Sequence, residues 1–370
     1  MARTRKRPLH TSAKLFLPSG YLNWDYIMSR PEPFVLVVGG RGTGKTYGAL
    51  KWHYEHKRYF IFTRRTAAQI KTLMNPKLNP FKRLNADLHI NIQCYTIAGD
   101  VHAFAPMDET PSRNKRPVPS GDDIATVVPL STFANTRGFD ASEAESWIVD
   151  EVNPERNERP LQDECDVYLN AYETMCRNRE LEGAPPVKGI FMSNANTLKN
   201  PLLIGLELVT VLRKMERDGM QELSIPDRGL FIIKLKDSPI SAAKTDTALY
   251  RLAKGTRFAK MSLDNEFADD RESGSIRLSD VTVVRQYTPY VVIGELYIYK
   301  NNAPDKRLKE WYVSYTTQDK RPTTPIFPPD TTSTARFIKQ YHTLWEAYMY
   351  NHVLFEDYFA ELLFQKYFGK

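Results

Sequence analysis

The amino-acid sequence predicts an α/β fold, a mostly parallel sheet covered by helices, followed by a smaller α+β domain. The first observation is that short apolar runs alternate with helical stretches over residues 34–218. The second is that the apolar runs are β-branched and lack polar alternation, as expected of strands buried on both faces. The third is that strand patterns crowd together after Pro226, several in near-hairpin succession. This change, from strands that alternate with helices to strands in close succession, indicates a second domain.

In the first domain, each apolar run predicts a strand and each longer periodic segment predicts a helix. Strands are expected at residues 34–38, 59–63, 89–97, 126–130, 147–149 and 187–192. Helices are expected at residues 45–57, 67–73, 161–180 and 202–218. Residues 105–123 are rich in proline, charge and small polar side chains, which predicts a long loop.

In the second domain, strands are expected at residues 230–235, 281–285, 290–299 and 311–315. Residues 341–368 are strongly aromatic at helical spacing, and one core-facing stripe would contain Tyr348, Phe355, Phe359 and Leu362. The expected organisation is a basic leader (1–30), a first domain (31–218), a linker (219–228) and a second domain (229–370).

Composition favours a folded protein in a reducing compartment. The chain has 370 residues, of which 42% are hydrophobic, and a formal net charge of +7. This charge favours an anionic partner without requiring one. An odd number of cysteines without C-x-x-C spacing argues against a disulfide or zinc framework; they are Cys94, Cys165 and Cys176. No run of eighteen apolar residues exists, so we expect no membrane span and a cytoplasmic protein.

One motif carries most of the functional information. GGRGTGKT follows the first buried strand, precedes a helix, and satisfies the phosphate-binding pattern G-x-x-x-x-G-K-[ST]. Its glycines let backbone N–H groups and a helix N-terminus face an anion. Lys45 would reach the β- and γ-phosphates of ATP, and Thr46 would supply a hydroxyl ligand to Mg²⁺. The expected nucleotide-binding residues are Gly39, Gly40, Arg41, Gly42, Thr43, Gly44, Lys45 and Thr46.

The segment WIVDE predicts the second half of the same site. An apolar strand that ends in Asp150 and Glu151 puts both carboxylates at the carboxyl edge of the sheet, where ligands bind in open α/β folds. Asp150 would hold Mg²⁺, largely through water, and Glu151 would polarise the water that attacks the γ-phosphate. A kinase of small molecules does not need the second carboxylate, so the pair favours hydrolysis. The expected class is a P-loop NTPase of the additional-strand, catalytic-glutamate type.

Two further groups follow in chain order, each with two interpretations. Ser193 and Asn194 come just after an apolar strand, where a polar side chain can sense the γ-phosphate or can simply cap a helix. Arg177 and Arg179 end a predicted helix, where they can complement its dipole or can reach the ATP of a neighbouring subunit as an arginine finger.

An ordered set of motifs now points to a family. Arg41 within the P-loop, LSTFANTRGFDASEAESWIVDE, CRNRE, MSNANTLKNP and KMSLDNEF (260–267) follow one another along the chain. This set resembles the DNA-packaging (encapsidation) ATPases of phi29-like tailed bacteriophages and, more distantly, the large terminases of other tailed phages. The resemblance runs over residues 34–267 as separate motifs.

The resemblance implies a motor that pumps double-stranded DNA into a preformed procapsid using ATP and Mg²⁺. It implies a homopentameric ring on the portal vertex, with the portal protein and a structural packaging RNA as partners, in the host cytoplasm. Carried over by position, Lys45, Thr46, Asp150 and Glu151 keep the roles given above. Arg177 matches the trans finger, and Ser193 and Asn194 match the coupling motif. The second domain would be an RNase H-like nuclease that has lost its activity.

Other functions remain open on the residues alone. Two-metal cleavage needs three or four carboxylates that converge from strand ends. Residues 290–299 contribute only Glu295, and the acidic cluster Asp264, Glu266, Asp269 and Asp270 lies in a polar stretch, which favours an inactive domain used for binding. The alternatives are a terminase that cuts DNA and a nucleotide-dependent regulator of assembly. Arg113, Lys115 and Arg116 are candidate contacts to DNA phosphates.

Overall fold

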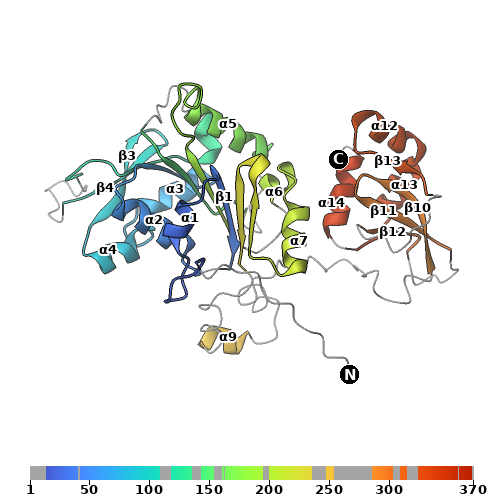
Figure 1. The fold of residues 1–370 in the computed structure, drawn as a ribbon, viewed down its shortest axis with the longest axis horizontal. Helices are drawn as coiled ribbons and strands as arrows, with labels where there is room; N and C mark the ends of the chain where they lie inside the picture. Colours follow the sequence, from blue (N-terminus) through green and yellow to red (C-terminus); the bar gives the residue numbers. More distant parts are fainter. Residues whose placement is uncertain are drawn as a thin grey trace. The chain divides into compact units, whose positions relative to one another are not determined.

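The structure is a computed structural model of the chain. It describes residues 14–40, 42–108, 118–135, 143–153, 161, 163–194, 200–235, 247–253, 286–302, 309–314, 324–356 and 358–368. The chain divides into two compact units, Met1–Ala268 and Asp269–Lys370 (Figure 1). No helix among the described residues is both long and apolar enough to cross a bilayer.

The first unit is built on a nine-stranded sheet in the order β3-β4-β5-β2-β6-β7-β1-β9-β8. Neighbouring strands from β5 to β9 run parallel, and β3, β4 and β8 extend the two edges in antiparallel pairs. The strands are β1 (Phe34–Gly39), β2 (Phe60–Thr63), β3 (Ile92–Ala98), β4 (Val101–Pro106), β5 (Ala125–Val127), β6 (Ser146–Asp150), β7 (Lys188–Asn194), β8 (Glu222–Ile225) and β9 (Leu230–Lys234). The predicted mostly parallel sheet is therefore confirmed.

Helices cover both faces of this sheet (Figure 1). One face carries α1 (Trp24–Met28), α2 (Lys45–Glu55), α3 (Ala67–Leu73) and α4 (Lys82–Leu88), whose apolar side chains join alternate residues of the strands in one core. The other face carries α5 (Glu164–Cys176), α6 (Pro201–Gly205) and α7 (Val209–Asp218). There Trp147 of β6 packs between Tyr168 of α5 and Phe191 of β7, with ring centroids 6.2 and 5.5 Å away. The turns η1 (Leu130–Asn135) and η2 (Pro226–Arg228) and helix α9 (Ala248–Leu252) complete the unit.

The N-terminal segment belongs to the core, which corrects the expected leader 1–30. Leu15 and Ile27 are fully buried, and Leu22 and Trp24 are nearly so. The Asn23 side chain caps α1 by accepting a hydrogen bond from the Tyr26 amide at 3.3 Å. These apolar residues pack in the same core as α2, α3 and α4, so this segment is part of the fold and not a solvated leader. The more basic part of the expected leader, residues 1–13, lies outside the described residues.

The expected linker 219–228 is also wrong. Residues 222–234 form β8 and β9, and β9 pairs in parallel with β1 from Phe34 opposite Leu230. The run 230–235 is buried because it extends the first sheet, so the two units divide between Ala268 and Asp269 instead. The sequence pattern predicted the strand at residues 230–235 but assigned it to the wrong sheet. Which strand it pairs with depends on contacts between residues that are distant along the chain.

Helix α4 and strand β4 are among the elements of the first unit that the sequence analysis missed. Helix α4 ends at Leu88, so the strand expected from residue 89 begins only at Ile92, as β3. Strand β4 (Val101–Pro106) lies partly where the loop 105–123 was expected, and it pairs with β3 in a hairpin. The rest of that loop falls partly outside the described residues.

The second unit holds a five-stranded sheet in the order β13-β10-β11-β12-β14. Its strands are β10 (Tyr287–Ile293), β11 (Leu296–Asn301), β12 (Trp311–Ser314), β13 (Ile326–Phe327) and β14 (Val353–Phe355), and its helices are α12 (Thr331–Gln340), α13 (His342–Met349) and α14 (Tyr358–Tyr367). The single strand expected at 290–299 is a hairpin that turns at Gly294, where φ is +53°. The expected strand 281–285 lies outside the described residues.

The aromatic segment 341–368 is not one helix, which corrects the expected stripe. Strand β14 separates α13 from α14, and Phe355 lies on that strand. Phe355 and Tyr348 do belong to one core, with ring centroids 5.8 Å apart. The side chains of Phe359 and Leu362 lie outside the described residues.

Candidate functional site

The glycine-rich loop leaves the carboxyl end of β1 and enters α2 at Lys45. Gly42 and Gly44 have φ values of +73° and +86°, in the left-handed region that favours glycine. A side chain at Gly39 would also collide with Leu235, because its Cβ would lie 2.6 Å from the Leu235 Cδ1 atom. The backbone conformation therefore favours glycine at residues 42 and 44, and the contact with Leu235 favours it at residue 39.

Lys45 is largely buried against its own loop. Its Nζ atom donates to the carbonyl oxygens of Gly39 and Gly40, at 2.8 Å each, and to the Asn194 Oδ1 atom at 3.3 Å. Thr43 also donates to the Gly40 carbonyl, at 3.1 Å. The amine is thus held at the mouth of the loop, between the ends of β1 and β7.

Thr46 and Asp150 meet at the same edge, although they are 104 residues apart in sequence. The Thr46 Oγ1 atom donates to the Asp150 Oδ1 atom at 2.7 Å. Asp150 ends β6 and is 3% exposed, so its carboxylate is a buried charge that needs partners. The structure thus brings together the two side chains predicted as metal ligands.

Arg64 is the charged partner that sequence reasoning missed. Its Nε and Nη2 atoms donate to the Asp150 Oδ2 atom at 3.2 and 2.8 Å. Parallel pairing of β2 with β6 sets Thr63 opposite Val149, so the residues that follow each strand are neighbours. The available signal was the basic pair directly after the strand YFIFT. Reading it required knowing that β2 lies beside β6.

Glu151 follows Asp150 with a backbone φ of +62°. A non-glycine residue in the left-handed region is uncommon, and such residues gather at functional sites. Strand β6 ends here, and the next amide, that of Val152, donates to the Met192 carbonyl of β7 at 3.0 Å. The chain therefore turns sharply at the predicted catalytic glutamate, close to the end of β7.

Ser193 and Asn194 lie within β7 rather than after it. Beyond its contact with Lys45, Asn194 accepts a hydrogen bond at its carbonyl from the Asn153 side chain, at 2.6 Å. Asn200, the N-cap of α6, donates to the Asn153 side chain and to the Val152 carbonyl. Asn200 is therefore the helix cap, and Asn194 is directed to the loop instead.

The two arginines of CRNRE occupy different environments. Arg179 donates to the carbonyls of Ala144 and Pro185, at 2.8 Å each, and so ties the end of α5 to the start of β6. Arg177 is the exposed C-cap of α5 with a φ of +44°. Asp150 is at the carboxyl end of β6, whereas Ala144 lies just before its amino end. Both arginines therefore lie at the amino ends of the strands, on the side of the sheet away from Asp150. The expected helix 161–180 is shorter, with 13 residues and about 20 Å of length.

Several predicted residues lie outside the described part of the chain. They are Arg41, Arg113, Lys115, Arg116, Asp264, Glu266, Asp269 and Asp270, together with the segment 260–267. Glu295 lies in the turn between β10 and β11. The DNA contacts and the inactive nuclease-like character of the second domain therefore stay predictions.

The groups that converge here fit a magnesium nucleotide. Thr46 and Asp150 offer a hydroxyl and a carboxylate oxygen, the hard ligands that Mg²⁺ takes. The Lys45 amine and the glycine backbone offer donors to phosphate oxygens. Strand β7 separates β1 from β6, so a ligand on the loop reaches Asp150 across the end of β7, where Asn194 lies.

Fold and site together define an α/β protein with a phosphate-loop-like site at the carboxyl edge of a mostly parallel sheet. The family model described as Podovirus DNA encapsidation protein (Gp16) matches residues 116–288. The DNA packaging protein of Bacillus phage phi29 is 26% identical over 262 residues, which are 69% of this chain and 66% of that protein. The DNA packaging protein of Bacillus phage PZA is 26% identical over 260 residues, which are 68% of this chain and 66% of that protein.

A solved structure of the bacteriophage phi29 viral genome packaging motor assembly shares the fold. Its TM-score is 0.51 at 18% identity, over 94% of this chain and 99% of that chain. The resemblance predicted from the sequence is therefore confirmed: this chain is similar to the DNA packaging proteins of phi29-like phages. The sequence match covers 66% of the length of those curated relatives.

Proposed function

We propose that this chain is a Mg²⁺-dependent ATPase that drives double-stranded viral DNA into a procapsid. The observation that carries the proposal is the convergence of Lys45, Thr46 and Asp150 at one sheet edge, in a chain similar to phage DNA packaging proteins. The position of β7 between β1 and β6 supports the additional-strand class of P-loop ATPases.

Each residue has a role that follows from its place. Mg²⁺, when bound, would bridge phosphate oxygens and neutralise their developing charge. Thr46 and Asp150 would hold it, and Lys45 would turn from its loop carbonyls to the phosphates. Glu151 would orient and polarise the attacking water, and Asn194, already bonded to Lys45, would sense the γ-phosphate.

The assembly is part of the proposal. We infer a homopentameric ring on the portal vertex, in the host cytoplasm, with DNA and portal protein as partners and a packaging RNA as a further one. Arg177 would complete the active site of the neighbouring subunit, because the length of β6 separates its end of the unit from Asp150 of the same chain. The second unit would bind nucleic acid as an inactive, RNase H-like domain.

The test is ATP turnover and binding in matched variants. Lys45→Ala should lose ATP binding and turnover, because it removes the cation of the loop. Glu151→Gln should bind ATP but lose about 10²–10⁴-fold in turnover, because only the group that polarises water is removed. Lys71→Ala and Glu173→Gln, both at exposed positions on helices, are the controls.

Parental turnover in Glu151→Gln would contradict the assignment of the base. ATP turnover that double-stranded DNA does not stimulate would favour the regulator alternative. Linearisation of a plasmid with Mg²⁺ or Mn²⁺ would favour a terminase that cuts DNA.

A further inference from the structure

A cavity of about 800 Å³ lies on the outer side of the phosphate loop. One wall is the N-terminal segment, with Tyr21 and Trp24, and the other is the outer face of α2, with Tyr47 and Trp52. Gly42 and Gly44 of the loop also line it. The cavity is therefore continuous with the loop that would hold the phosphates, and its size is that of a small-molecule site.

Tyr21 is fixed directly over the loop. A Cβ atom at Gly44 would lie 2.8 Å from the Tyr21 Cδ1 atom, so the ring packs on the Gly44 backbone. The turn that carries Tyr21 is closed by two backbone hydrogen bonds, Leu17 amide to Tyr21 carbonyl and Gly20 amide to Leu17 carbonyl, at 2.8 Å each. The ring is nevertheless 45% exposed, so part of it remains available to a ligand.

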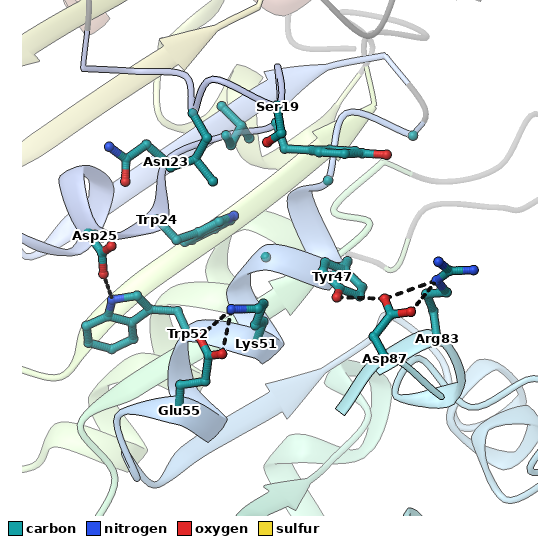
Figure 2. Close-up of a pocket in the computed structure, with 16 residues that line it drawn as sticks. Ser19, Asn23, Trp24, Asp25, Tyr47, Lys51, Trp52, Glu55, Arg83 and Asp87 are labelled. Carbon is teal, nitrogen blue, oxygen red and sulfur yellow. Dashed lines mark hydrogen bonds and ion pairs between the residues drawn. The ribbon is translucent and has the colours of Figure 1, made fainter. Parts of the chain in front are cut away.

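The charged side chains of the cavity compensate one another. Figure 2 shows Lys51 paired with Glu55, and Asp87 bonded by both Tyr47 and Arg83. The Trp52 indole donates to Asp25 at 3.0 Å. Two cations and three carboxylates line the cavity, so its charge is slightly negative and it disfavours a phosphate. Burial and the hydrogen bond to Asp87 raise the pKa of Tyr47 to about 12, which keeps its phenol neutral.

We propose that this cavity binds the base and ribose of a purine nucleotide whose phosphates lie in the loop of residues 39–46, with Tyr21 stacked on the base. The inference rests on the proposed function and adds the part of the site that recognises the nucleoside. An uncharged aromatic ligand matches aromatic walls of low net charge, and its link to the loop passes Gly44, which Tyr21 touches. The segment before β1 thereby becomes part of the nucleotide site.

The experiment compares ATP with inorganic tripolyphosphate, both with Mg²⁺, by calorimetry on the full chain. Tyr21→Ala should weaken ATP binding about tenfold or more, because base stacking is lost, and should leave tripolyphosphate binding unchanged. Tyr21→Phe should bind ATP like the parent, since the ring remains. Tyr350→Ala, at a 76% exposed tyrosine of the second unit, is the matched control.

Gly48→Ala is a second variant that acts on the opposite wall. A Cβ atom there would lie 2.2 Å from the Trp24 ring, so the ring must shift and deform the cavity, again with a selective loss of ATP binding. Unchanged ATP affinity in Tyr21→Ala, or equal weakening of ATP and tripolyphosphate, would overturn the proposal. If the parent bound neither ligand, the proposed function itself would fail. These results are distinguishable because the parent protein is measured beside every variant.

Discussion

His53 is a buried base on α2, 1% exposed, with Phe60 of β2 beside it at 4.8 Å between ring centroids. Its Nδ1 atom lies 2.8 Å from the Ala49 carbonyl, which can only accept, so the neutral ring carries its proton on Nδ1. Burial lowers the pKa of His53 from 6.5 to about 4. The unfolded chain therefore binds a proton at a pH where the folded chain does not.

This difference predicts that the first unit loses stability as pH falls from 6.5 to about 4. Above pH 6.5 the ring is neutral in both states, and below about 4 it is charged in both, so the loss is confined to that window. Its size is about 3 kcal/mol. The free energy of unfolding, measured by urea titration at a series of pH values, should change less with pH in His53→Phe than in the parent. His342→Gln, at an exposed histidine, is the control and should behave like the parent. Parallel curves for all three proteins would contradict the assignment.

At the same scale, the sequence predicted the residues with a motif and missed those without one. Lys45, Thr46 and Asp150 were found because spacing within a known pattern determines their roles. Arg64 was missed because its contact with Asp150 depends on which strands are neighbours. Tyr21 was missed because nothing in the local sequence shows that the chain before β1 folds back over the loop.

At the scale of elements, the buried ion pair between Arg65 and Glu164 joins the end of β2 to the start of α5. Both side chains are completely buried, and two hydrogen bonds of 2.7 Å connect them. Glu164→Gln should lower the free energy of unfolding by about 3–5 kcal/mol, because it leaves a buried charge without its partner. The exposed pair Arg58–Glu145, also at 2.7 Å, is the matched control, and Glu145→Gln should change stability by about 1 kcal/mol or less. Equal effects in a urea titration would refute this difference.

Element boundaries were the least predictable part of the fold, for one shared physical reason. Arg177 ends α5 at a φ of +44°, Glu207 separates α6 from α7 at +55°, and Asn351 precedes β14 at +62°. Past Glu207 and Asn351 the apolar period continues, so the pattern there predicted one longer helix. A single left-handed residue other than glycine interrupts a helix without altering that pattern.

At the scale of the whole molecule, the proposed ring predicts complementation between subunits. Glu151→Gln lacks the base and Arg177→Ala lacks the finger, so each protein alone should be inactive. In mixed rings some interfaces pair an intact Glu151 with an intact Arg177, and ATP turnover should partly return. Arg179→Ala should behave differently, because it loses bonds to Ala144 and Pro185 and therefore lowers stability. Rings shown to be mixed but without recovered turnover would exclude a trans role for Arg177.

Two adjacent arginines at the end of β2 connect the active edge of the sheet to helix α5. Arg64 binds the carboxylate of Asp150, whereas the next residue, Arg65, binds Glu164 in the first turn of α5. The two residues share a peptide unit, so the backbone that holds Arg64 at Asp150 also holds the anchor of α5. Helix α5 is a rod of about 20 Å that ends at Arg177, at the opposite edge of the sheet. In the proposed ring, this chain of contacts would connect one active site to the residue proposed to serve the next.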